Sequence, residues 1–277
     1  MVTKEQIEER LKSYHVGLWF LAVFFISILF LVYISRFIPE GTFSIGANVN
    51  YSDNNPQYFS VYWAKFLQII CLGLVFGVIY YILMRIMLSK VDKDKGRNKY
   101  YVYLLEISVL ILIVINCWGH LLHLGFEGVN AIDASEGEAL NSEYKELFVY
   151  AWYMDEWLGH TSIHISYFGY LVLALLAELL LEDQKKLEMD ELFFTFLFAI
   201  AIGILDGNIG IKSESGLFLL IIHIIFTASA ILIILIKKID PRRYPILLAM
   251  LLSLVFVIYF NLEVIFTQGI SARYPFY

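Results

Sequence analysis

Seven long apolar runs constrain this chain more than any other feature. Each approaches the roughly 20 residues that an α-helix needs to cross the hydrocarbon core of a bilayer. The runs occupy residues 16–37, 63–84, 101–124, 157–181, 192–205, 217–236 and 245–266. The fifth run is short for a span, and we expect its helix to extend back through Asp190 or forward to Ile211. The pattern predicts an all-α, polytopic membrane protein with seven transmembrane helices.

The composition indicates a membrane protein without a large soluble domain. Of the 277 residues, 60% are hydrophobic and 17% are charged, whereas soluble domains average roughly half apolar and a quarter charged. The mean hydropathy is +0.71. Seven spans use the whole chain, so we expect one helical bundle over residues 1–277, in contact with membrane lipid. The sequence has no phosphate-binding glycine loop and no basic face for nucleic acid, which excludes nucleic acid as a partner.

The distribution of basic residues predicts the orientation in the membrane. If the N-terminus is cytoplasmic, most of the 20 Lys and Arg residues fall at the cytoplasmic ends of the spans. The basic residues that remain on the outer side are Arg36, Lys65, Lys145, Lys212 and Arg273. Because cytoplasmic segments carry the excess of Lys and Arg, we expect a cytoplasmic N-terminus, an extracytoplasmic C-terminus and a multi-pass protein of the cell membrane.

Two longer segments lie on the outer side in this topology. Residues 38–62 are polar and rich in turn formers, so we expect a loop there. Residues 127–156 carry many acidic side chains and a single basic one, Lys145. This acidic extracytoplasmic loop is either an ordinary solvated segment or a vestibule that raises the local concentration of cations.

Histidines and carboxylates are concentrated at the outer ends of the expected spans. His120 and His123 lie near the outer end of the third span. Glu156, His160 and His164 follow one another at intervals of four at the start of the fourth span, so they share one face of a helix. Ionisable side chains inside a membrane are costly and usually functional. By contrast, the acids near the cytoplasmic ends of the spans are isolated, and we expect these, Glu106 and Glu178, to reach the interface.

The outer cluster predicts a metal site in a cavity that opens outwards. Neutral imidazole is the commonest metal ligand, and histidines three or four residues apart let one helix supply two ligands. The expected site residues are His120, His123, His160, His164 and His223 as ligands, Asp206 and Glu263 as further ligands or orienting groups, and Glu156 and Asp155 as a catalytic base or further ligand. Zinc is the metal we expect, with copper and iron as alternatives.

Three functions fit such a site. The first is a metal-dependent membrane enzyme, a hydrolase or an oxidase, that acts on a lipid-like substrate near the outer leaflet. The second is a transporter or receptor in which the histidines bind a cation or relay protons. The third is an electron carrier with a haem held by two histidines from different helices. The ordinary alternative is that each histidine hydrogen-bonds neighbouring helices together. Partner subunits are left open.

The architecture resembles that of the seven-span metal-dependent hydrolases, the alkaline ceramidases and adiponectin-receptor-like proteins. The resemblance is carried by the seven spans, by His160-Thr161-Ser162-Ile163-His164 and by the acids nearby. It implies a zinc ion bound by three histidines, together with an aspartate and a serine. These families place a serine four residues before a histidine, whereas the corresponding residues here are Asn116, Gly119, Glu156, His160 and Leu219. Their paired histidines lie in the last span, which has none here, so the resemblance is one of architecture.

Overall fold

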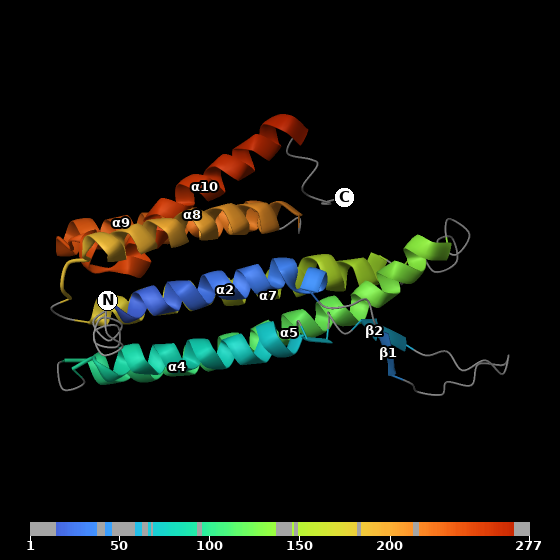
Figure 1. Cartoon of the computed structure of the whole chain (residues 1–277), viewed down its shortest axis with the longest axis horizontal. Coiled ribbons are helices and arrows are strands. Elements are labelled where there is room, and N and C mark those ends of the chain that lie inside the picture. The colour runs from blue at the N-terminus through green and yellow to red at the C-terminus, as the bar shows by residue number, and fades with distance from the viewer. Residues whose placement is uncertain are drawn as a thin grey trace, which may run out of the picture.

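The computed structural model describes residues 15–37, 42–45, 59–62, 66–67, 69–92, 96–136, 146, 149–181, 184–212 and 216–268. These residues form seven α-helices, which Figure 1 colours from blue to red along the sequence. The α-helices are α2 (Val16–Phe37), α4 (Phe76–Ser89), α5 (Asn98–Glu136), α7 (His160–Leu180), α8 (Met189–Lys212), α9 (Gly216–Lys237) and α10 (Pro245–Gln268). Two π-helical segments, η1 (Ile69–Val75) and η2 (Tyr153–Gly159), lead directly into α4 and α7, and a 3₁₀ turn, η3 (Pro241–Arg243), precedes α10.

Three helical segments are long and apolar enough to cross a membrane: Ile69–Ser89, Asn98–Phe126 and Val149–Leu180. Shorter apolar helices cover Val16–Phe30, Ile221–Lys237 and Pro245–Phe260. The described residues therefore confirm a helical chain with segments suited to a membrane. The number of spans, their orientation and the identity of the membrane stay predictions.

The helix bounds differ from the expected spans in three places. The sequence predicts the second span at 63–84, whereas η1 and α4 together cover 69–89. α5 runs on to Glu136, so helix occupies the first part of the segment 127–156. α8 begins at Met189 and ends at Lys212, so the short fifth run extends at both ends.

A small antiparallel sheet lies between α2 and η1, where the sequence predicts only a loop. β1 (Thr42–Ile45) pairs with β2 (Phe59–Tyr62), with Thr42 opposite Tyr62 and Ile45 opposite Phe59. Both strands contain aromatic and β-branched residues, which favour extended backbone. Each strand has only four residues, too few for the alternation of a strand to stand out in a turn-rich segment.

The helices form three layers, with α2 and α7 between α4 and α5 on one side and α8, α9 and α10 on the other (Figure 1). α5 packs along α7, α10 packs along α8, and α2 contacts both α4 and α8. The core of the middle layer is aromatic, because Phe24 lies edge-on to Tyr167 and Tyr80 stacks on Tyr170. α2 therefore joins the two outer layers through its buried aromatic face.

Two buried carboxylates hold the N-termini of helices. Glu178, near the end of α7, accepts hydrogen bonds from the backbone N–H groups of Ile246 (3.1 Å) and Leu247 (3.3 Å) in the first turn of α10. Glu191, in the first turn of α8, accepts from the backbone N–H of His15 (3.3 Å) and so joins the starts of α8 and α2. Unpaired N–H groups and the helix dipole both favour a carboxylate at such positions. Glu178 is thus a buried structural group, where the sequence predicts an isolated acid that reaches the interface.

Candidate metal centre

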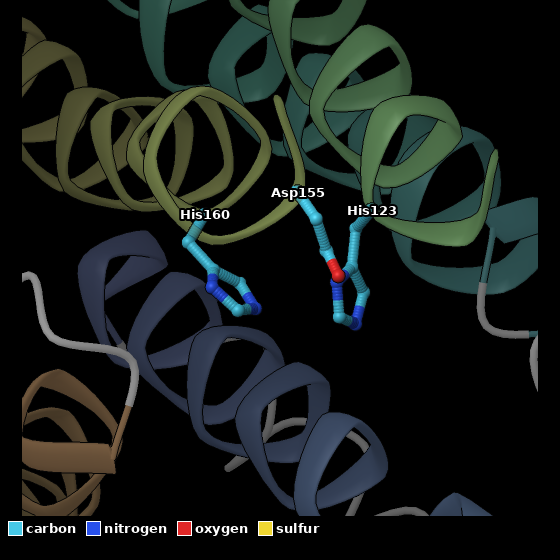
Figure 2. Close-up of side chains that lie close together, drawn as sticks. All are labelled: His123, Asp155 and His160. Atoms are coloured by element: carbon cyan, nitrogen blue, oxygen red, sulfur yellow. The ribbon is translucent and has the colours of Figure 1, made fainter. Parts of the chain in front are cut away.

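Three side chains from different segments converge on one point in the bundle. His123 comes from α5, Asp155 from η2 and His160 from the first residue of α7. One potential ligand atom from each residue lies within 4.8 Å of the corresponding atoms of the other two. Figure 2 shows the two imidazole rings and the carboxylate facing a common space. Asp155 is buried and both histidines are half-buried, so the group is reachable without being fully solvated.

His123 and Asp155 are in direct contact. The Nδ1 atom of His123 lies 2.5 Å from Oδ1 of Asp155, within hydrogen-bond distance. The His160 ring lies beside the His123 ring, with centroids 4.6 Å apart and planes tilted by 42°. A carboxylate that holds one nitrogen of an imidazole fixes its tautomer and directs the other nitrogen toward a metal. Asp155 can therefore support the centre by orienting His123 or by coordinating the metal itself.

A π-helical turn brings Asp155 to the same side of the helix as His160. Residues five apart in an α-helix point about 140° apart around the axis, so regular helix geometry selects Glu156 and not Asp155 as the partner of His160. In η2 the backbone N–H of His160 donates to the carbonyl of Asp155, which is the i→i+5 pattern of a π-helix. The wider turn rotates Asp155 toward His160. Single π-helical turns occur frequently at functional sites.

Two glycines allow α5 to approach η2 and α7 closely. A Cβ atom on Gly159 would lie 3.1 Å from the backbone nitrogen of His123 and 3.4 Å from the carbonyl oxygen of Gly119. A Cβ atom on Gly119 would lie 2.9 Å from the backbone nitrogen of Ile163. Small residues at such contacts let membrane helices pack backbone to backbone. A side chain at either position would push apart the helices that carry the three ligands.

His120 and His164 lie outside this group. Each is about one helical turn deeper in the bundle than its neighbour in the group, His123 or His160, and both are buried. The spacing of three or four residues therefore places His120 below His123 and His164 below His160. It does not bring both histidines of a pair to the same point.

The other predicted site residues are dispersed. His223 is buried in α9 and lies edge-on to the ring of Phe168, with centroids 4.6 Å apart. Glu263 is exposed on α10. The side chains of Glu156 and Asp206 lie outside the described residues. The structure thus joins two of the five predicted histidines with one of the predicted acids.

Close contacts also join α5 to η1 below the group. The spacing places Asn116 on the helix face of His120 and His123, whereas its partner in η1 does not follow from the sequence. Asn116 is fully buried in α5 and donates a hydrogen bond of 2.8 Å to the carbonyl of Leu72 in η1. Beside it, a Cβ atom on Gly73 would lie 3.4 Å from the Cα atom of Cys117. The sequence signal for these contacts is the presence of small residues inside apolar runs, which marks positions where helices meet closely.

Comparison of the chain with protein families, with curated proteins and with solved structures found no match. Two imidazoles and one carboxylate form a ligand set used by catalytic zinc and by non-haem iron(II), and both metals keep positions for water or substrate in such sites. The group formed by His123, Asp155 and His160 could hold a metal ion of this kind.

Proposed function

We propose that this protein is a membrane enzyme that binds a transition metal ion, with zinc as the first choice, through His123, Asp155 and His160. The observation that carries the proposal is the mutual distance of at most 4.8 Å between the three potential ligand atoms. Ligands of a tetrahedral zinc ion at about 2.0–2.2 Å from the metal lie about 3.3 Å from one another. Small side-chain rotations would close the remaining difference.

The number of protein ligands favours a catalytic metal over a structural one. Structural zinc sites in proteins are closed by four protein ligands, whereas catalytic sites have three and bind water or substrate at the fourth position. A zinc-bound water is an effective nucleophile near neutral pH, which would support hydrolysis. Iron(II) in the same ligand set would support oxidation. The identity of the metal therefore decides between the two enzyme classes.

An apolar cavity on the same pair of helices supports a lipid-like substrate. Its volume is about 350 Å³, and it is lined by residues of α5, α7 and α9, among them Leu112, Ile165 and Phe226. The lining is apolar and lies inward of the centre on α5 and α7, so the cavity suits a hydrocarbon chain held against the bundle.

A cation or proton transporter is the second candidate, because further buried polar side chains, including His120, His164 and Tyr167, follow the centre into the bundle. A haem held by two histidines receives no support from the histidines of the centre. The rings of His123 and His160 lie with centroids 4.6 Å apart, which leaves no room for a porphyrin between them.

Metal analysis of point variants tests the proposal. Protein stripped with a chelator, equilibrated with zinc and freed of excess metal should retain about one zinc ion per chain. His123→Ala and His160→Ala should each lose it, and Asp155→Ala should bind it more weakly. His223→Gln is the matched control, because His223 is a helix histidine that lies against Phe168, outside the group, and it should retain the ion. Wild-type protein that retains no zinc, iron or copper would overturn the proposal, as would full occupancy in His160→Ala.

The enzyme and transporter candidates are separated by two further measurements on the loaded protein. The enzyme should turn over fluorogenic phospholipid or ceramide analogues in mixed micelles, and His160→Ala should not. The transporter should instead move zinc or protons into sealed liposomes that contain the protein. Flux without turnover would replace the enzyme proposal with the second candidate.

A further inference from the structure

Polar side chains continue inward from the metal centre on both helices that carry it. Each helix presents one such residue per turn: His120 and Asn116 on α5, and His164 and Tyr167 on α7. With a rise of 1.5 Å per residue, these positions extend to about 10 Å below the centre. All four side chains are buried. We call these four residues the polar column.

A cluster of hydroxyl groups lies at the inner end of the polar column. The ring of Tyr80 stacks on that of Tyr170, with centroids 4.5 Å apart, and Tyr167 lies edge-on to Tyr170. The hydroxyl groups of Ser27 and Tyr80 are 2.5 Å apart. The Tyr170 hydroxyl faces Gly77, where a Cβ atom would lie 3.4 Å from it. We call Ser27, Tyr80, Tyr167 and Tyr170 the tyrosine hub.

The buried polar atoms that lack a hydrogen-bond partner in the part of the chain that the structure describes include the Tyr170 hydroxyl and Oδ1 of Asn116. They are close in the fold, because Ile113, one turn from Asn116, contacts the same Gly77 position that the Tyr170 hydroxyl faces. Burial of an unpaired hydroxyl or amide oxygen is costly. Buried polar atoms that no protein group satisfies are usually bonded to internal water.

We infer that the polar column and the tyrosine hub hold a chain of internal water molecules that reaches the centre formed by His123, Asp155 and His160. Water at these positions would satisfy Tyr170 and Asn116 and would bridge the polar side chains between them and the centre. The use of this chain rests on the proposed function, because a metal-bound water that is consumed in hydrolysis needs replacement water and a route for its proton. The chain would supply both from inside the bundle.

The water chain ends inside the bundle and does not cross it. On α7 the next turn on the same side is apolar and buried, with Leu171, Ala174 and Leu175, and the buried Glu178 beyond it is bonded to the start of α10. A hydrocarbon layer of this kind does not conduct protons. The inferred water chain is therefore closed at its inner end and connects only to the centre. A proton transporter would instead need a continuous path across the bundle.

Radiolytic hydroxyl-radical footprinting of the metal-free protein tests the inference, because radicals form from water inside the protein and label side chains beside it. We expect Tyr170 and Tyr167 to be labelled at least fivefold faster than Phe168, a buried aromatic residue of the same helix whose ring contacts His223 and Phe226 and not the tyrosine hub. Asn116→Leu should reduce the labelling of Tyr170 several-fold. Labelling of Tyr170 at the rate of Phe168 would overturn the inference. Because no metal is present, this result is independent of whether the metal proposal holds.

The melting temperature of Tyr170→Phe gives a second, independent measurement. Removal of a buried hydroxyl that has no partner stabilises a protein, whereas removal of one bonded to water does not. We expect a melting temperature that is unchanged or lower than that of the wild type. Tyr80→Phe is the matched control, because it loses a hydrogen bond to Ser27 that is present in the protein itself, and its melting temperature should fall. A clear rise for Tyr170→Phe would show a dry hub and overturn the inference.

Discussion

Replacement of Gly119 by alanine should weaken metal binding although Gly119 contributes no ligand. A Cβ atom at this position would lie 2.9 Å from Cβ of Ser162 and from the backbone nitrogen of Ile163, whereas ordinary contacts are 3.4–4 Å. The contacted atoms belong to the body of α7, so a rotamer change cannot relieve the contact. α5 must therefore move away from α7 at this level, by about 0.5–1 Å.

The expected loss of zinc affinity follows from the narrow range of metal–ligand distances that a site tolerates. Metal–ligand distances in proteins vary by only about 0.2 Å, and α5 carries one ligand while η2 and α7 carry the other two. Loss of a supporting interaction around a metal typically costs ~10–100-fold in affinity, and we expect the Kd of Gly119→Ala for zinc to rise by that factor. Overpacking should also lower the free energy of unfolding by about 1–3 kcal/mol.

Gly125→Ala is the matched control on the same helix. A Cβ atom at Gly125 would meet nothing within 4 Å, so this variant shares the change in backbone entropy without the steric contact. A competition titration against a fluorescent zinc chelator measures both Kd values in detergent, and thermal unfolding of the metal-free proteins measures both stabilities. The wild-type Kd in Gly119→Ala would refute the reasoning, because the helix contact would then not position the ligands.

Two further predictions concern the ends of helices. Glu178→Leu should lower the melting temperature, because it leaves the backbone N–H groups of Ile246 and Leu247 unpaired at a cost of ~1–3 kcal/mol. Glu178→Gln keeps a hydrogen-bond acceptor, so its melting temperature should fall less. Equal melting temperatures for Glu178→Leu and the wild type would contradict the capping role. Asp240 precedes η3, and its hydrogen bonds to the Arg242 guanidinium, 3.0 and 3.1 Å long, lower its pKa to about 2. Its stabilisation should be complete above about pH 4 and be lost as the pH falls toward 2, so chemical denaturation across this range should show a step that Asp240→Asn lacks.

The helices could be predicted from the sequence because the length of each apolar run determines them. Runs of about 20 apolar residues have to satisfy their backbone within the run, and the helix is the only local way to do so. The extension of α5 to Glu136 was not predicted, because a polar helix has no apolar run that marks its end. The short strands β1 and β2 were missed for a similar reason, since four residues carry too little periodicity.

The set of residues from which the centre is drawn could be predicted from the sequence, but the members of the centre could not. The costly groups were expected near the outer ends of the spans, and His123, Asp155 and His160 come from that set. Their selection depends on the π-helical turn in η2 and on the close contact at Gly119, and neither follows from a regular spacing of 3.6 residues. The buried capping role of Glu178 could not be predicted for a similar reason, because its partner is the start of a helix that lies far along the chain.

The π-helical turn in η2 makes the centre depend on backbone geometry as well as on residue type. If Tyr153–Gly159 formed a regular α-helix of the same length, Asp155 would lie about 140° around the axis from His160. The apolar surface of α7 begins after that segment and would be unchanged. A chain of this architecture can therefore gain or lose its metal chemistry through the winding of a single turn, with the rest of the bundle unchanged.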